Sequence, residues 1–268
     1  MEGWHEDVVE VNSLRLHVIR TGHGDNPALL LLHGLTDHGR YWARTAAAFA
    51  NLYDVVMLDQ RGHGLSDQPA SGYSDEEMAA DAAGVIEALA LAPAAVLGHS
   101  MGGAVTTVLA GARPDLVSRA VLLDPVLNHT GTTNDGPPRD RRSDWYQRNL
   151  ADKQLTAAEL AQRCLEQHPR WDAEDCRYWA ESNLQVDPEA IRQFYVRRPW
   201  QETLPLIQCP TLLIHGDKAL GSIVGAELAA EIMRAAPHVK AARIAHAGHS
   251  AQRTQFPAYI AAVRNFLN

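Results

Sequence analysis

The stretch Gly98-His99-Ser100-Met101-Gly102 decides the fold. It follows the apolar residues 94–97, typical of a buried strand, and precedes a helical pattern of apolar residues over 104–112. A serine at such a turn, with glycine two positions to either side, predicts a nucleophile elbow. The elbow would raise Ser100 Oγ above the sheet, beside the first N–H groups of the helix. Because a serine hydroxyl alone is a weak nucleophile, the pattern also predicts a histidine base and an acid elsewhere.

Short apolar strands alternate with helical segments on both sides of this elbow. Residues 7–12 and 14–21 alternate apolar and polar side chains, which predicts an antiparallel hairpin. Residues 28–32 and 94–97 are continuous apolar runs, typical of strands covered on both faces, and further strands are predicted at residues 54–58, 117–123, 211–214 and 241–244. We therefore expect an α/β fold with a doubly wound, mostly parallel sheet of eight strands, whose ligands bind at the carboxyl ends of the strands.

The pattern changes between residues 126 and 208, where charged and aromatic residues become more frequent and helical segments follow one another. We interpret this segment as a helical cap inserted after the strand that ends at Asp124, with residues 1–125 and 209–268 forming the core. Residues 131–142 contain Gly136-Pro137-Pro138 and predict a flexible loop.

Composition narrows the class of protein. The 268 residues, 46% of them apolar, suffice for one large domain with an inserted subdomain. The net charge is −8 with both signs interspersed, so neither a nucleic acid nor a membrane surface is indicated as a partner. The amino terminus lacks signal-peptide order, and no apolar run approaches the roughly 20 residues of a membrane span. Nothing in the sequence sets the oligomeric state, and a homodimer remains open.

The three cysteines, Cys164, Cys176 and Cys209, have no metal-ligand spacing and are odd in number. We interpret them as small buried apolar side chains in a reducing compartment, which favours a cytoplasmic location.

Four motifs carry a family resemblance. They are, in chain order, His33-Gly34, Asp59-x-Arg61-Gly62-x-Gly64-x-Ser66, Gly98-x-Ser100-x-Gly102 and Gly248-His249. With them, the chain resembles the α/β-hydrolases over nearly its whole length, as a capped, serine-nucleophile member similar to esterases and lactonases. The resemblance implies the chain order serine, acid, histidine and no cofactor or metal. It makes His249 the general base toward Ser100 and then the general acid toward the leaving group.

Other histidines border the predicted site and compete for the role of base. The chain has 13 histidines, so most must be structural or exposed. The places of His33, His63, His99 and His246 in the family pattern indicate supporting roles.

The acid departs from the commonest family pattern. That pattern is Gly-Asp-x-Asp, whereas this chain has Gly216-Asp217-Lys218-Ala219, with a methyl group at the usual acid position. The alternative acid position of the fold follows the preceding strand, and Asp124 occupies it. Some lipases, lactone hydrolases and cofactor-free dioxygenases of this fold place the acid there. We assign the acid to Asp124 and keep Asp217 as its rival, although Asp217 also fits a loop carboxylate that binds local backbone N–H groups.

An oxyanion hole needs two donors about 3 Å from the developing charge. The elbow geometry supplies the N–H of Met101, and the resemblance indicates the N–H of Leu35 as the second. We expect Asp59 and Arg61 to organise the loop beneath the site without a catalytic role.

Trp145, Trp179 and Asn183 of the cap are our candidates for facing the substrate. Trp179 and Asn183 are one helical turn apart, although an aromatic residue on a helix is more often simply packed. The leading hypothesis is hydrolysis of an ester or lactone of a small, largely apolar substrate through an acyl-enzyme on Ser100. Alternatives are a carbon–carbon bond hydrolase, a perhydrolase or a cofactor-free dioxygenase with the same Ser-His-Asp set. A non-catalytic ligand receptor on this fold is a further alternative.

Overall fold

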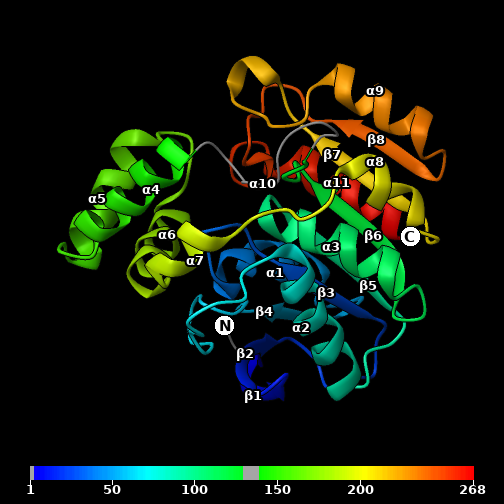
Figure 1. The fold of residues 1–268 in the computed structure, drawn as a ribbon, viewed down its shortest axis with the longest axis horizontal. Coiled ribbons are helices and arrows are strands. Elements are labelled where there is room, and N and C mark those ends of the chain that lie inside the picture. The colour runs from blue at the N-terminus through cyan, green and yellow to red at the C-terminus, as the bar shows by residue number, and fades with distance from the viewer. Residues whose placement is uncertain (1–2, 129–138) are drawn as a thin grey trace.

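The computed structural model describes residues 3–128 and 139–268. Its strands form one eight-stranded sheet in the order β1-β2-β4-β3-β5-β6-β7-β8 (Figure 1). The pairs β1·β2 and β2·β4 are antiparallel and the other pairs are parallel, as the sequence predicts. The strands are β1 (His5–Val11), β2 (Leu14–Arg20), β3 (Ala28–Leu32), β4 (Asp54–Leu58), β5 (Ala94–His99), β6 (Val117–Leu123), β7 (Thr211–His215) and β8 (Val239–Arg243).

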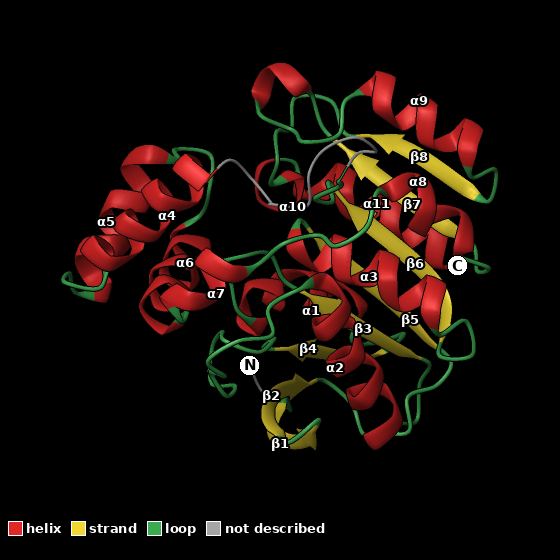
Figure 2. Cartoon of the chain, in the orientation of Figure 1, coloured by secondary structure: helices red, strands yellow, loops and turns green. Residues whose placement is uncertain are grey.

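Helices cover both faces of the sheet (Figure 2). The helices of the core are η1 (Gly39–Trp42), α1 (Ala43–Phe49), α2 (Asp75–Ala88), α3 (Met101–Ala112), η3 (Lys218–Leu220), α9 (Ala226–Ala235), α10 (Ala251–Thr254) and α11 (Phe256–Leu267). Ser74 caps α2 in a reciprocal pair with Glu77, as its position before three acidic residues predicts.

Two apolar cores result from the alternation of side chains along the strands. In β3, Leu30 and Leu32 join the cluster beneath α2, α3 and α9, whereas Leu29 and Leu31 join the cluster beneath α1 and α11. Because both faces are buried, each of these four leucines is fully shielded from solvent. This double burial explains why the strand reads as a continuous apolar run rather than as an alternating one.

Among the described residues between β6 and β7 are five helices and a 3₁₀ turn. They are α4 (Arg139–Asp152), α5 (Ala157–Gln167), α6 (Ala173–Gln185), α7 (Pro188–Gln193), α8 (Trp200–Thr203) and η2 (Leu204–Leu206). Helices α4–α7 form a group beyond the carboxyl ends of the strands, and we call this group the cap helices (Figure 1). Helix α8 and η2 instead return to the core and pack against α3.

Two sequence expectations in this segment need correction. Helix α4 begins at Arg139, so the last part of the predicted loop over 131–142 is helical, while residues 131–138 lie outside the described residues. Cys164 and Cys176 are not free thiols, because a disulfide joins them and ties α5 to α6. Disulfides persist mainly in oxidising compartments, so the cysteines no longer favour a cytoplasmic location. Only Cys209 matches the expected free, buried thiol. Within the described ranges, no helix has the length and apolar character needed to cross a membrane.

Candidate active site

Ser100 lies at a sharp turn between β5 and α3. Its backbone has φ 53° and ψ −112°, in the positive-φ region that residues with a side chain rarely adopt. The turn requires glycine at both ends. A Cβ added to Gly98 would lie 2.0 Å from the carbonyl oxygen of Gly102, and a Cβ added to Gly102 would lie 2.2 Å from the carbonyl oxygen of Leu32. The strained serine and the two close backbone contacts are the features of a nucleophile elbow.

Asp124 and His249 meet at the carboxyl end of the sheet, 125 positions apart in the chain. The Nδ1–H group of His249 donates to Asp124 Oδ2 at 2.6 Å. The carboxylate side chain is 1% exposed and the imidazole 34%, so the acid is enclosed while the base can reach a substrate. The bond fixes the tautomer of His249 and leaves its Nε2 as the proton acceptor.

The loop after β7 holds the Asp124 carboxylate. Ser222 Oγ donates to Oδ1 at 2.7 Å, and the amides of Ile223 and Val224 donate to Oδ2 and Oδ1 at 2.8 Å. This loop is the one in which Ala219 replaces the usual family acid, so it supplies hydrogen-bond donors in place of a carboxylate. Our sequence analysis missed Ser222, since a serine in a loop gives no signal of a long-range partner.

Asp217, the rival acid, lies elsewhere. Its carboxylate accepts from Arg243 Nε at 2.7 Å and from the amide of His246 at 2.9 Å. The hydrogen bond with Arg243 and the His246 amide lower its pKa. The structure therefore gives Asp217 the local loop contacts of a structural carboxylate and brings Asp124, not Asp217, to His249.

The competing histidines His33 and His63 have their Nδ1 atoms bound to backbone. The Nδ1–H group of His33 donates to the Gly34 carbonyl and its Nε2 accepts from the Gln60 amide, while His63 Nδ1–H donates to the Arg61 carbonyl. Burial lowers the pKa of His33 to about 3 and that of His63 to about 4. Both rings are therefore neutral supports of the loops around the site.

The loop after β3 lies against the elbow. A Cβ added to Gly34 would be 3.4 Å from Ser100 Cβ, which places this glycine beside the nucleophile. Among the described residues, no protein group accepts a hydrogen bond from the amide of Leu35 or Met101. Two unsatisfied amides next to a reactive serine have the composition of an oxyanion hole.

Asp59 and Arg61 hold the loops beneath the site, where we expected them to act. Asp59 accepts from the amides of Gly39 and Leu65 and from His17. Burial raises the pKa of Asp59, but the bond from His17 and the nearby imidazoles outweigh it and bring the pKa to about 2. Arg61 forms a buried pair with Asp81 and donates to the Gly72 carbonyl.

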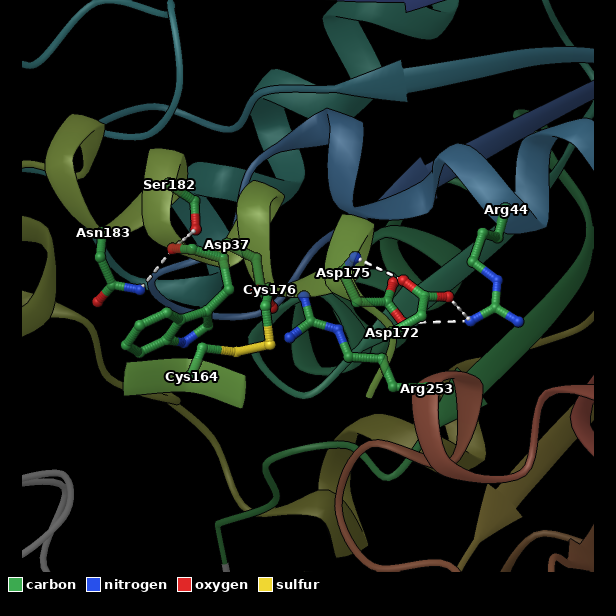
Figure 3. Close-up of a disulfide and its surroundings, with 10 residues drawn as sticks. Asp37, Arg44, Cys164, Asp172, Asp175, Cys176, Ser182, Asn183 and Arg253 are labelled. Carbon is green, nitrogen blue, oxygen red and sulfur yellow. Dashed lines mark hydrogen bonds and ion pairs between the residues drawn. A yellow bond between two sulfur atoms is a disulfide. The ribbon is translucent and has the colours of Figure 1, made fainter. Parts of the chain in front are cut away.

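The start of α6 and the turn before it meet Arg44 and Arg253 of the core (Figure 3). Arg44 binds Asp172 at 2.7 Å and Asp175 at 3.1 Å, both from the start of α6. The guanidinium of Arg253, on α10, lies between two rings, 3.8 Å from the centroid of Tyr41 and 4.0 Å from that of Trp171 in the cap.

Arg253 also approaches Asp37 of the loop after β3, with Nη2 3.4 Å from Oδ1. Burial raises the pKa of Asp37 to about 6, against the opposing charges of Arg253 and His249. From the helix that follows His249, one guanidinium therefore contacts both the cap and the loop after β3. Arg253, Asp37 and Trp171 were not predicted from the sequence as residues of the site.

The three predicted substrate-facing residues lie in the cap helices. Trp145 on α4 is 49% exposed, whereas Trp179 on α6 is half-buried. The Asn183 side chain is buried and donates to the Trp179 carbonyl at 2.8 Å, within the helix. The structure brings Trp179 and Asn183 together and leaves Trp145 on the exposed side of α4. No group of three potential metal ligands occurs among the described residues.

Comparison with known proteins bears on the fold of the chain. The family model described as alpha/beta hydrolase fold matches residues 27–254. The chain is 26% identical to 2-(acetamidomethylene)succinate hydrolase of Mesorhizobium japonicum, over 97% of this chain and 94% of that protein. It is 27% identical to N-formylmaleamate deformylase of Pseudomonas putida, over 97% and 95%.

Other matches support the fold or part of the chain only. Epoxide hydrolase 1 of Caenorhabditis elegans is 35% identical over 45% of this chain, and the chain spans 30% of that protein. The crystal structure of an E-2-(acetamidomethylene)succinate hydrolase superposes with a TM-score of 0.84 at 24% identity, covering 98% of this chain and 99% of that one.

Proposed function

Because the chain belongs to the α/β-hydrolase family, we propose that it is a serine hydrolase that cleaves a carboxylic ester or lactone of a small, largely apolar substrate. The observation that carries the proposal is the 2.6 Å bond between His249 and the enclosed Asp124 carboxylate, at the sheet edge where Ser100 occupies a strained turn. This arrangement can activate a serine hydroxyl without a metal or cofactor.

The reaction would proceed in two halves. His249 Nε2 takes the proton of Ser100 Oγ as the oxygen attacks the acyl carbon, and the amides of Leu35 and Met101 stabilise the oxyanion. The imidazolium, stabilised by Asp124, then protonates the leaving group and leaves an acyl-enzyme. A water molecule, activated by the same histidine, releases the acid and restores the serine. Proton transfer requires the imidazole of His249 within hydrogen-bond reach of Ser100 Oγ in the substrate complex.

A second candidate is hydrolysis of an acyl amide on the same residues. It is favoured by the two relatives that match over nearly the whole chain, whose names specify an acetamido compound and an N-formyl compound. In either case we propose that residues 126–208 act as the cap and that Trp179 and Asn183, rather than the exposed Trp145, face the acyl pocket.

The test is turnover of p-nitrophenyl esters from acetate to decanoate, beside N-acetyl and N-formyl amides, with wild type and Ser100→Ala. We expect multiple turnover that falls by about 10⁴-fold or more in the variant, together with loss of labelling by a fluorophosphonate. Ester turnover with an optimum at short chains supports the leading proposal, and amide turnover without ester turnover supports the second. Equal activity of wild type and variant would overturn both. Tight binding of these compounds without turnover would indicate a receptor.

A further inference from the structure

The ring of His99 lies directly beside the proposed base. Its Nε2–H group donates to the backbone carbonyl of His249 at 3.0 Å, and the two ring centroids are 4.6 Å apart with planes inclined by 39°. His99 is 3% exposed. Since His99 immediately precedes Ser100, one residue connects the backbone of the nucleophile to the backbone of the base.

The surroundings of His99 fix both its ring and its tautomer. Tyr41 stacks on it at 5.9 Å with planes 9° apart, and Trp42 meets it edge-on at 6.4 Å. Its Nδ1 is buried without a hydrogen-bond partner and would lie 3.1 Å from a Cβ at Gly34. The only bonded ring nitrogen is therefore Nε2, and because a carbonyl can only accept, Nε2 carries the proton.

The charges around His99 keep that proton arrangement constant. Burial lowers the pKa of His99 well below its ordinary value, and the facing groups His249, Arg253 and His33 lower it further, although the bond to the His249 carbonyl opposes them. The ring is thus neutral while His249 gains and loses its proton. A neutral neighbour adds no repulsion when the imidazolium forms.

The hydrogen bond from His99 holds the main chain of His249 itself. Among the described residues, no other hydrogen bond reaches the main chain of His249. The adjacent loop is held further away, where the amide of Asp217 donates to the Ala247 carbonyl and Arg170 donates to the His246 carbonyl. The Asp124 bond fixes the imidazole at Nδ1, but the position of its Cα depends on His99.

On the premise of the proposed serine hydrolase, we infer that His99 is a positioning residue whose Nε2–H bond to the His249 carbonyl sets the approach of that imidazole to Ser100. Removal of the bond would let residue 249 drift and lengthen the path of the proton. The loss would appear in the chemical step rather than in substrate binding, because His99 is buried and enclosed by Tyr41, Trp42 and Gly34.

Two substitutions separate the donor from the ring. His99→Gln keeps an N–H donor near the position of Nε2, and His99→Phe keeps a flat ring against Tyr41 without the donor. With p-nitrophenyl acetate, we expect His99→Phe to lower kcat about tenfold, the effect of one lost hydrogen bond, with KM changed less than about twofold. We expect His99→Gln to restore kcat to within about threefold of wild type. The ratio of wild-type to His99→Phe rates should not change with pH, because burial keeps the pKa of His99 well below its ordinary value.

Each other outcome counts against the inference. Equal kcat for His99→Phe and wild type, or equal impairment of the Gln and Phe variants, would overturn it. A rate ratio that changes with pH would mean that His99 itself transfers protons. If the phenylalanine variant does not fold, His99→Leu provides the donor-free comparison. Fluorophosphonate labelling of Ser100 in wild type distinguishes failure of the inference from failure of the proposed function. If wild type shows neither labelling nor ester turnover, the proposed function fails and the inference fails with it. If wild type shows both, the His99 variants test the inference alone.

Discussion

The catalytic edge of the sheet and the cap helices are held by different kinds of contact. Asp124 accepts three hydrogen bonds from one short loop and binds His249, all inside the core. The cap helices meet the core through ion pairs at Arg44, through rings at Arg253 and through α7, whose Ala190 and Ile191 are buried in the apolar cluster beneath α2 and α3. A disulfide ties α5 to α6. On the proposed function, the comparison assigns the chemistry to the core, and we expect the shape offered to the substrate to depend on how the cap helices contact it.

The sharpest test of the catalytic edge pairs Asp124→Asn with Asp217→Asn. We expect Asp124→Asn to lower kcat by about 10⁴-fold, because an amide cannot hold the tautomer of His249 or stabilise its cation. Asp217→Asn should change kcat less than about threefold, since its partners are Arg243 and the His246 amide. The measurement is ester turnover, with urea unfolding to check that both variants are folded. The reverse ranking would refute the assignment of the acid.

The double variant Cys164→Ala/Cys176→Ala probes the cap. Loss of a crosslink between positions 12 apart should lower the free energy of unfolding by about 3 kcal/mol, through the larger entropy of the unfolded chain. The rate of Ser100 labelling should change less than about threefold, because the triad lies in the core. Cys209→Ala removes a buried thiol without a crosslink and serves as the control. If the double variant lost stability and its rate of Ser100 labelling also fell more than about threefold, the cap would affect the triad as well as its own stability.

Trp179→Ala and Trp145→Ala compare two positions within the cap. Helix α6 packs against η1, beside the loop that carries Leu35, so we expect Trp179→Ala to raise KM about tenfold, the effect of burying one large apolar side chain against substrate. Trp145 is largely solvent-exposed, and its removal should raise KM less than about twofold. Steady-state kinetics over the ester series measures both. A larger effect at Trp145 would mean that α4 forms more of the pocket than α6.

The smallest expected effect concerns His17 in the core. Burial lowers its pKa, but its bonds to Asp59 and Glu6 outweigh this, so the folded-state pKa is above the ordinary value of 6.5. A raised pKa stabilises the fold below about pH 6.5, and this contribution is lost as the pH rises through the folded-state pKa. Urea unfolding from pH 6 to 9 should therefore show a stability difference between wild type and His17→Gln that shrinks with rising pH. A difference that grows with pH would contradict the assigned sign.

Much of the fold was predictable because the deciding signals are local. The elbow glycines, the apolar strands and the Ser74 cap each need only neighbouring residues, and a mostly parallel sheet follows from strands alternating with helices. The pairing of Asp124 with His249 needed the family's chain order, and Ser222 needed coordinates, since nothing in residues 216–224 indicates a partner 98 positions away. The disulfide was missed because two cysteines on neighbouring cap helices are indistinguishable, by spacing, from two buried thiols.

The sandwich of Arg253 between Tyr41 and Trp171 bears on how this scaffold can be diversified. A cap is a suitable unit to exchange when a new substrate range is sought, because its two ends connect to two adjacent strands, here β6 and β7. Here the guanidinium of the buried Arg253 contacts Tyr41 of the core and Trp171 of the cap. A grafted cap without a flat aromatic side chain at that place would leave the guanidinium uncovered on one side. Grafting on this chain should therefore retain residues 168–172 or replace Arg253 together with the cap.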